Sequence, residues 1–436
     1  MTHFSGYECS LCGARYAPGD VTYTCPEDDG ILDVRLAYDA IRREQGPADI
    51  ARSTVRSLWR YAPLLPVPVP DSPSGPLASV GCTPLYPAAR AAKRLGLEQL
   101  WLKDDGRLPT GSLKDRASAI VTARALDQGI ERIITASTGN AGVAQAAMSN
   151  AAGLPGVVVV PEAAPPAKVA QLVVFGAQLL LVRGNYDAAF DLAVAASREL
   201  GWYCRNTAMN PFTAEGKKTV AFEICEQLSA QLAAGAGTVG ATCPDGFGRR
   251  AGPERWTAPD RIFVSVGDGN IISGLHKGLK DLHALGWIER MPKLVGVQSE
   301  GSAAIANAFR EGTETITPVS ASTVADSIAA DRPADGVRAL RAATQTGGAI
   351  VTVTDEQILD AIVSLGRDAT IFAEPAASTA YAGLIQQVEA GAVAPDERIV
   401  VLITGNGLKD VAAAAKATAD PPRNEPTVEA LRKAHG

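Results

Sequence analysis

Short apolar runs alternate with longer amphipathic or alanine-rich segments from about residue 77 toward the C-terminus of this chain. The run at 157–160 is continuous and β-branched, which is typical of a parallel strand that is covered on both faces. Runs of this kind predict strands at 100–103, 133–136, 157–160, 178–182, 261–266, 293–298, 349–353 and 398–403. The alternation of strands with helices predicts an α/β fold with mostly parallel sheets flanked by helices.

The segments between these strands have the composition and period of helices. We predict helices at 112–128, 141–152, 166–175, 186–200 and 215–235. Asp115 stands three residues after Ser112, a spacing that resembles a capping box at a helix start. Residues 37–61 are predicted to form a mostly helical arm. The prolines of 62–70 predict an extended linker, because proline fixes φ and donates no backbone hydrogen bond.

Two segments lack periodicity. Residues 235–258 are rich in Gly, Pro and Arg and are predicted to be a surface insert. Residues 420–436 are polar and are predicted to form a loose tail or a short helix.

The composition narrows the class of protein. The chain has 436 residues, of which 46% are apolar and 20% charged, as in an ordinary globular protein. Its net charge of −6 argues against a nucleic-acid or anionic-membrane partner. No apolar run reaches the roughly 18 residues of a spanning helix, and the first residues lack the pattern of a signal peptide. We therefore expect a cytoplasmic protein that binds neither nucleic acid nor membrane.

Lys114 lies in the stretch 109–116, where a helix is predicted to begin. Most lysines at such places are solvated surface residues. A cation in the first turn is unfavourable with the helix dipole, by roughly 0.3–1 kcal/mol. A Schiff base with a carbonyl cofactor would remove that charge, and lysine is the residue that forms one. The sequence therefore makes Lys114 a candidate catalytic residue.

Several polar turns follow predicted strands. The Ser-Thr-Gly-Asn turn at 137–140 offers hydroxyls and backbone N–H groups to a carboxylate. The glycine-containing loop at 266–271 precedes a helix and can bind a phosphate, although a plain tight turn is the ordinary alternative. A dinucleotide fingerprint would need glycine where Ile272 stands. Thr404 emerges at the carboxyl end of a strand, where α/β proteins bind ligands.

In this order, these motifs resemble the active site of the tryptophan synthase β-like (fold-type II) pyridoxal-phosphate enzymes, and among them the threonine synthase family. The resemblance covers about 77–412 and includes Thr83-Pro84-Leu85. It implies pyridoxal 5′-phosphate, a small-molecule amino-acid substrate and a homodimer. It also implies a large cofactor-binding domain of 37–107 with 206–419, and a small mobile domain of 108–205.

The resemblance makes Lys114 the Schiff-base lysine, and places Asn140 at the cofactor O3′ and Thr404 at its ring nitrogen. The residues expected at the cofactor are Lys114, Asn140, Gly267, Asp268, Gly269, Asn270, Ile271, Glu374 and Thr404. The residues expected at the substrate are Ser112, Ser137, Thr138, Gly139, Asn206, Lys217 and Lys218. On the residues alone, the two lysines are equally well explained as a solvated helix start.

The reaction implied is γ-elimination and β-hydration of O-phospho-L-homoserine to L-threonine and phosphate. Two departures from the family pattern favour an alternative, a β-eliminating or β-replacing lyase of the serine or threonine dehydratase type. The stretch Val266-Gly267-Asp268-Gly269-Asn270 is one residue shorter than the common V-G-N-A-G-N and contains Asp268. Thr213 stands where N-P-x-R-x-E-G-x-K-T has a basic residue. A catalytically silent homologue, a partner-binding protein and an NAD-dependent oxidoreductase are weaker alternatives.

Three cysteines lie in the first 36 residues, a segment that we expect to be zinc-ribbon-like. Cys9, Cys12 and Cys25 give C-x2-C and one further cysteine, with no fourth cysteine nearby. Asp28 or His3 would complete a tetrahedral zinc site, although carboxylate is an unusual structural partner for thiolates. The alternative is a degenerate ribbon that keeps its shape by packing alone.

Overall fold

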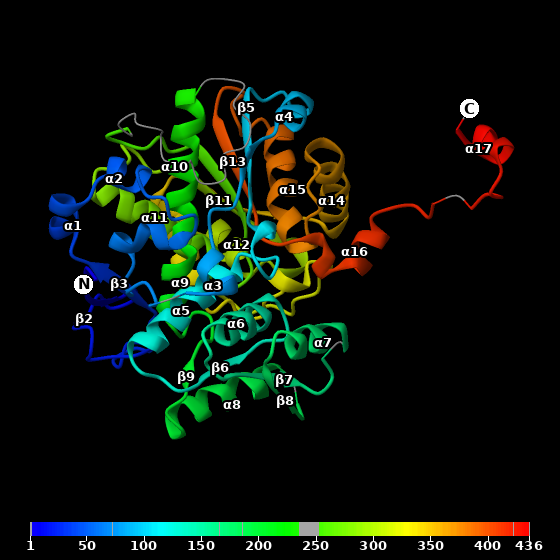
Figure 1. The fold of residues 1–436 in the computed structure, drawn as a ribbon. Coiled ribbons are helices and arrows are strands. Elements are labelled where there is room, and N and C mark those ends of the chain that lie inside the picture. The colour runs from blue at the N-terminus through cyan, green and yellow to red at the C-terminus, as the bar shows by residue number, and fades with distance from the viewer. Residues whose placement is uncertain are drawn as a thin grey trace.

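The computed structural model describes residues 2–71, 73–164, 166–184, 186–234, 253–421 and 423–435. The predicted insert at 235–258 therefore lies outside the described residues, except for 253–258. Two β-sheets flanked by helices form the body of the molecule (Figure 1).

The larger sheet has six strands in the order β12-β11-β10-β13-β5-β4. The strands are β4 Leu85–Pro87, β5 Gln99–Asp104, β10 Arg261–Ser265, β11 Lys293–Ser299, β12 Ala349–Val353 and β13 Arg398–Ile403. All neighbours are parallel except β4, which runs antiparallel to β5 at one edge. Successive side chains of β10 point to opposite faces, so Ile262 and Phe263 belong to two different apolar cores. Both faces of the sheet are thus buried, as its continuous apolar strands require.

The helices that cover the larger sheet come from before and after the smaller sheet in sequence (Figure 1). On the face of Phe263 lie α4 Ala89–Leu95, α14 Asp355–Ala369 and α15 Pro375–Glu389. On the face of Ile262 lie α10 Thr219–Ala234, α11 Asn270–Ala284, α12 Ala304–Glu311 and α13 Gly336–Gln345. Short 3-10 turns connect these elements at η2 Asp105–Arg107, η3 Glu300–Ser302, η4 Asp326–Ile328 and η5 Gly407–Lys409.

The smaller sheet has four parallel strands in the order β8-β7-β6-β9. The strands are β6 Ile133–Ala136, β7 Gly156–Pro161, β8 Gln178–Val182 and β9 Tyr203–Cys204. Its helices are α5 Lys114–Asp127, α6 Asn140–Ala151, α7 Pro166–Val174 and α8 Tyr186–Glu199. The prediction of an α/β fold with mostly parallel sheets is confirmed. The division into a large and a small mobile domain stays a prediction.

The N-terminal residues form a three-stranded antiparallel sheet of β1 Phe4–Cys9, β2 Arg15–Tyr16 and β3 Leu32–Leu36. The helical arm follows as α1 Tyr38–Glu44, α2 Pro47–Ala51 and the 3-10 helix η1 Leu58–Leu64. The prediction of an extended linker at 62–70 is therefore wrong for 62–64, which close η1 with Pro63 inside it. Leu65 and Val67 are buried, so apolar packing fixes this segment against the core.

The capping-box prediction for Ser112 is wrong. Helix α5 begins at Lys114, after Leu113 in a helical conformation. The Asp115 carboxylate accepts hydrogen bonds from the backbone N–H (2.7 Å) and the hydroxyl (2.5 Å) of Thr110. Gly111, whose φ is +77°, turns the chain so that Thr110 lies over the first turn of the helix. Asp115 therefore holds the preceding loop, and Ser112 Oγ accepts from the Lys114 N–H at 3.2 Å.

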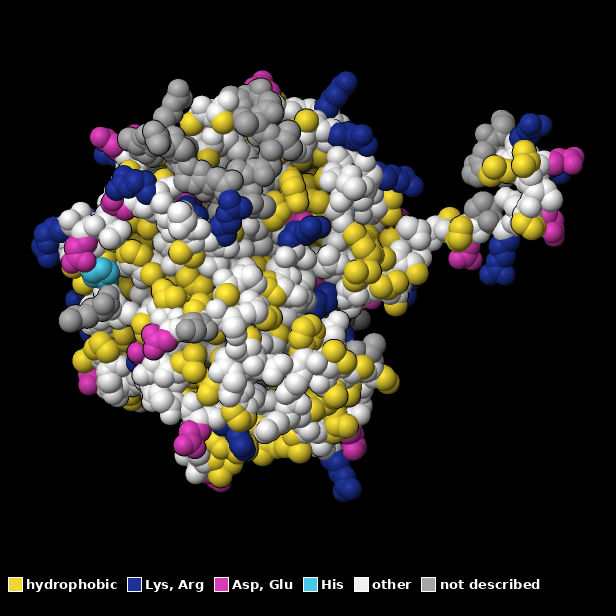
Figure 2. Space-filling model, in the orientation of Figure 1, with side chains coloured by type: hydrophobic (Ala, Val, Ile, Leu, Met, Phe, Trp, Pro, Cys, Tyr) yellow, Lys and Arg dark blue, Asp and Glu magenta, His cyan; other side chains and the backbone are white. Residues whose placement is uncertain are grey.

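The remaining helices are α3 Gly75–Ser79 before β4, α9 Phe212–Lys217 between β9 and α10, and α16 Val411–Lys416 and α17 Val428–His435 near the C-terminus. Helix α17 stands apart from the body at the end of an extended stretch, which agrees with the predicted tail or short helix (Figure 1). On the face drawn in Figure 2, Lys and Arg side chains are interspersed with acidic and apolar ones. Among the described helices, none is long and apolar enough to cross a membrane.

A buried network of charges joins α5 to the larger sheet. The Arg116 guanidinium pairs with Asp105 (2.7 Å) and with Glu223 (2.6 Å), and Glu223 also pairs with Lys103 (2.6 Å). All four side chains are fully buried. Burial alone raises the pKa of Glu223, but the charges of Arg116 and Lys103 outweigh it and hold that pKa well below the usual range. Thr83 joins the network through Asp105, at 2.6 Å.

We expect Glu223→Gln to lower the free energy of unfolding by about 3–5 kcal/mol, because it leaves buried cations without their shared carboxylate. The matched control is Glu314→Gln, since Glu314 also pairs with an arginine, Arg341, but with 54% of its side chain exposed. That change should cost about 1 kcal/mol or less. Thermal and urea unfolding of both variants measures the difference, and equal losses would contradict a special role for the network.

Candidate active site

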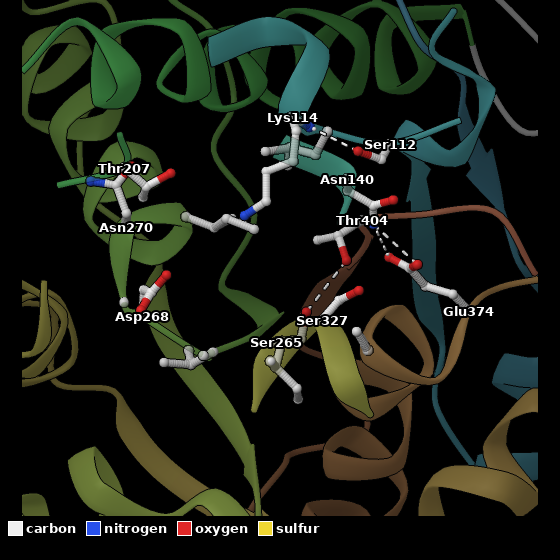
Figure 3. Close-up of a pocket in the computed structure, with 17 residues that line it drawn as sticks. Ser112, Lys114, Asn140, Thr207, Ser265, Asp268, Asn270, Ser327, Glu374 and Thr404 are labelled. Carbon is white, nitrogen blue, oxygen red and sulfur yellow. Dashed lines mark hydrogen bonds between the residues drawn. The ribbon is translucent and has the colours of Figure 1, made fainter. Parts of the chain in front are cut away.

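Lys114 points into a cavity between the two sheets (Figure 3). Within the described residues, its Nζ has no hydrogen-bond or ion-pair partner. Burial lowers the pKa of Lys114, and the charge of Arg205 lowers it further, against the opposing effect of Asp268. A lysine with a lowered pKa is more often neutral, and a neutral amine is the nucleophilic and basic form.

Backbone hydrogen bonds place this lysine against the end of β13. The Leu113 N–H donates to the Thr404 carbonyl at 2.9 Å, and the Asn406 N–H donates to the Gly111 carbonyl at 2.9 Å. The segment before Lys114 thus pairs with the segment that follows β13. Since β10 and β13 are parallel neighbours, their carboxyl ends also bring Ser265 and Thr404 together, with hydroxyls 3.5 Å apart.

The cavity and its opening to solvent together contain about 520 Å³ of space that atoms do not fill. Its walls contain predicted site residues from five separate segments. The residues that line it are Ser112, Leu113, Lys114, Asn140, Thr207, Ser265, Val266, Gly267, Asp268, Gly269, Asn270, Ile271, Ser327, Ile328, Glu374, Ala376 and Thr404. Every residue predicted to bind the cofactor therefore faces one space, as does Ser112.

The loop at 266–271 forms the start of helix α11. Gly269 precedes the helix with φ of +91° and offers no side-chain cap, so the first N–H groups of α11 are left to a ligand. An added Cβ at Gly267 would lie 2.7 Å from Ile328 Cα, so only glycine fits there. An uncapped helix N-terminus fits an anionic group such as a phosphate. Asp268 adds a negative charge to this loop, which distinguishes it from a plain anion site.

Glu374 and Asn140 form the opposite wall. The Asn140 Nδ2 donates to both Glu374 oxygens, at 2.9 and 3.1 Å (Figure 3). Burial raises the pKa of Glu374 to about 7, against the lowering effects of Asn140, Lys409 and Lys114. An added Cβ at Gly405 would lie 2.1 Å from Glu374 Oε1, so the glycine after Thr404 makes room for this carboxyl group.

The polar turn at 137–140 lies partly in this cavity and partly in an adjoining one. Thr138 and Gly139 line the adjoining cavity together with Lys168 and Lys409. Ser137 lines neither cavity, and its Oγ accepts from the Gly139 N–H at 3.3 Å. Thr138 and Gly139 are therefore accessible to a ligand, whereas Ser137 stabilises the turn through its hydrogen bond with Gly139.

The remaining predicted substrate residues occupy three different places. Asn206 Oδ1 accepts from the Ala136 N–H at 2.9 Å, so Asn206 holds the end of β6 behind the polar turn. Lys217 is fully buried, and its Nζ donates to Asn270 Oδ1 beside the cavity. Lys218 pairs with Asp281 at 2.9 Å and with Glu215. We correct the prediction for Lys218: it lines neither cavity, and its ammonium group is paired with these two buried carboxylates.

Sequence reasoning missed several residues of the cavity wall. Thr207 and Ser265 adjoin motifs that were recognised, so their position next to those motifs was the available signal. Ser327 and Ile328 come from η4, in a stretch without periodicity, and no local pattern marks them. They reach the cavity because the loop before α13 folds over the glycine at 267.

Comparison with known proteins agrees with this geometry. The family model of pyridoxal-phosphate dependent enzymes matches residues 77–405. A threonine synthase from Methanocaldococcus jannaschii is 35% identical over 427 residues, which are 98% of this chain and 98% of that protein. A threonine synthase from Halalkalibacterium halodurans is 35% identical over 363 residues, which are 81% of this chain and 91% of that protein.

Solved structures show the same fold. Threonine deaminase isoform 2 from Solanum lycopersicum has a TM-score of 0.62 and 21% identity, over 77% of this chain and 87% of that chain. Diaminopropionate ammonia lyase from Escherichia coli has a TM-score of 0.63 and 16% identity, over 85% of this chain and 91% of that chain. The prediction of a fold-type II architecture is confirmed, and the chain belongs to the pyridoxal-phosphate-dependent enzymes, in the family of the threonine synthases.

Proposed function

We propose that this enzyme converts O-phospho-L-homoserine and water to L-threonine and phosphate. The observation that carries the proposal is a second buried lysine, Lys217, beside a cavity that already contains Lys114 and an uncapped helix start. The cofactor would bind its one phosphate at the helix start and its carbonyl carbon at Lys114. Lys217 would then be left to bind the phosphate of the substrate.

The residues of the cavity fit pyridoxal 5′-phosphate. The N–H groups at the start of α11 would hold its phosphate, and Lys114 would bind its carbonyl carbon. Asn140 would hydrogen-bond its O3′ oxygen, and Thr404 would face its ring nitrogen. When bound, this cofactor withdraws electrons from the substrate Cα and so stabilises a carbanion there. The Lys114 amine would take the Cα proton and return protons along the substrate chain, for which its lowered pKa is suited.

Lys217 offers a substitute for the basic residue that the family pattern has at the position of Thr213. Thr213 and Lys217 lie four residues apart on α9, so they share one face of the helix. Both reach the same atom: Thr213 Oγ1 lies 3.4 Å from Asn270 Oδ1, and Lys217 Nζ donates to it. Burial, followed by the charges of Lys114 and Arg205, lowers the pKa of Lys217 well below its usual value. A phosphate group would offset this charge repulsion.

A second candidate is a β-eliminating or β-replacing lyase that acts on an unphosphorylated amino acid such as serine or threonine. Thr213 and the Asp268 carboxylate favour it, because both reduce the positive potential at the start of α11. The same lysine and the same Thr138-Gly139 turn would serve that reaction. The expected homodimer and the cytoplasmic location stay predictions.

Lys114→Ala should abolish turnover of O-phospho-L-homoserine and the visible absorption of the lysine-bound cofactor, because it removes the amine that would bind the cofactor carbonyl carbon and take the Cα proton. The control is Lys93→Ala, at an exposed lysine of α4, which should keep both. Phosphate and threonine should be released in equal amounts by the unaltered enzyme. A Lys114→Ala variant with full turnover would rule out this mechanism, and turnover of serine without any phosphate release would favour the second candidate.

Lys217→Gln should raise the KM for O-phospho-L-homoserine at least about tenfold, since a charge-assisted hydrogen bond contributes about 1.5–3 kcal/mol. Cofactor affinity, measured by absorption titration, should stay within about twofold. Thr213→Arg in the same variant should lower KM again, because arginine returns a cation to the same helix face. A fall in cofactor affinity with unchanged KM would instead assign Lys217 to the cofactor phosphate.

A further inference from the structure

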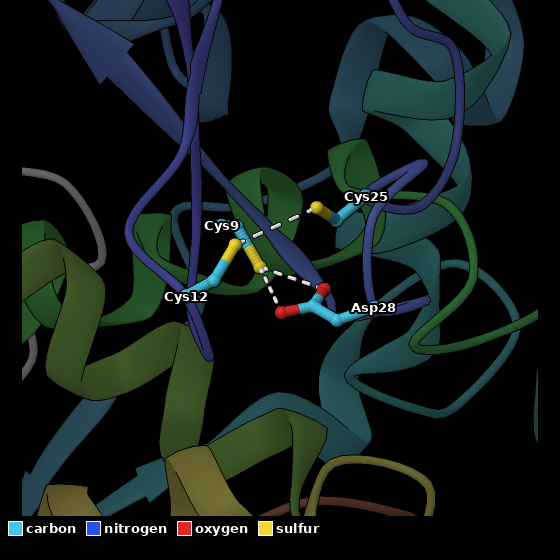
Figure 4. Close-up of side chains that lie close together, drawn as sticks. All are labelled: Cys9, Cys12, Cys25 and Asp28. Atoms are coloured by element: carbon cyan, nitrogen blue, oxygen red, sulfur yellow. Dashed lines mark hydrogen bonds between the residues drawn. The ribbon is translucent and has the colours of Figure 1, made fainter.

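We propose that Cys9, Cys12, Cys25 and Asp28 bind one structural zinc ion. The ligand atoms of these four residues all lie within 4.8 Å of one another (Figure 4). The proposal concerns the N-terminal sheet and does not depend on the proposed reaction. Four protein ligands leave no open position for a substrate, so this zinc would support the fold.

The two halves of the cluster are built alike. Cys9 and Cys12 are separated by two residues, and so are Cys25 and Asp28. In each half, the residue after the second ligand donates its N–H to the carbonyl of the first, at 3.1 Å in the Cys9 turn and 3.0 Å in the Cys25 turn. That residue has positive φ in both turns, +75° at Gly13 and +55° at Asp29. Asp28 therefore occupies the place that matches Cys12 in the other turn.

The spacings suit a tetrahedral zinc ion. Zn–S bonds of about 2.3 Å place two sulfurs about 3.8 Å apart, and a Zn–O bond of about 2.0 Å places oxygen about 3.5 Å from sulfur. Cys12 Sγ and Cys25 Sγ are 3.8 Å apart. Cys9 Sγ lies 3.3 and 3.6 Å from the two Asp28 oxygens. The side chains thus stand at the corners of a site of the right size.

Neighbouring groups hold the ligands in place. The Leu11 N–H donates to Cys9 Sγ at 3.3 Å, and the Gly30 N–H donates to Asp28 Oδ1 at 2.9 Å. Tyr16 Oη lies 3.0 Å from Cys25 Sγ, where its hydroxyl can donate to a thiolate. Such outer partners orient ligands and are typical of metal sites. His3, the other candidate for the fourth ligand, is 3.4 Å from Glu44 instead.

The same segment contacts helix α9 and strand β9 of the smaller sheet. The ring of Phe4, on β1, packs 5.9 Å from Phe212, the first residue of α9, which carries Lys217. Tyr23, between the two halves of the cluster, accepts a hydrogen bond from the Cys204 N–H at 2.8 Å, and its ring stacks on Tyr203 at 5.9 Å. A zinc ion that joins the 9–12 and 25–28 turns would hold these two contacts in a fixed relation.

The test uses the full-length enzyme with its cofactor, expressed in medium with added zinc. Elemental analysis should find one zinc per chain, and X-ray absorption spectroscopy should find three sulfurs at about 2.3 Å and one oxygen at about 2.0 Å. Cys12→Ser and Asp28→Asn should each lower the zinc content at least about tenfold after dialysis against a chelator, because each removes a direct ligand. Glu27→Gln, an exposed carboxylate in the same turn, is the control and should keep one zinc.

Asp28→Cys separates loss of metal from loss of folding. It should keep one zinc and give four sulfurs in the absorption spectrum, as a completed ribbon would. In the zinc-depleted Cys12→Ser variant, hydrogen exchange should increase across 203–217 while cofactor absorption shows that the protein is folded. A folded enzyme with no zinc, or zinc that survives both ligand substitutions, would overturn the proposal.

Discussion

The Arg116 ion pairs with Asp105 and Glu223 are the interaction on which the site depends most. Arg116 follows Lys114 by two residues, in the first turn of α5. A buried cation with two carboxylates has few alternative arrangements, because each alternative leaves a charge unpaired in a medium of low polarity. The network therefore fixes the first turn of α5, and with it the direction of Lys114.

Around that fixed point, the site is assembled from segments whose own geometry is simple. Two parallel strands end side by side, a helix begins with no cap, and glycines let Ile328 and Glu374 approach the backbone closely. The close packing of these segments buries the ionisable side chains of the site and so shifts their pKa values. Burial lowers the pKa values of Lys114 and Lys217 and raises that of Glu374, so charges are disfavoured until ligands arrive to pair with them.

The features that depend on neighbouring residues could be predicted from the sequence. The contacts between segments far apart in the chain could not. Strand and helix positions, the lysine at a helix start and the loop at 266–271 each follow from residues next to one another. The ion pair of Lys218 with Asp281 and the position of Ser327 at the cavity depend on segments far apart in sequence. Nothing in the proline spacing of 62–70 revealed that its first residues would close a 3-10 turn against the core.

The buried amine of Lys217 differs in kind from the guanidinium that the family pattern places one turn earlier. A guanidinium holds two oxygens in a plane and so dictates the angle at which a phosphate enters, whereas an ammonium is a point charge that accepts many angles. A phosphate group that bound beside Asn270 would therefore be held by its charge and hardly by its shape. Discrimination between substrates whose anionic side chains differ in length would then depend on the residues that line the cavity. Natural variation in these residues could alter the choice of substrate.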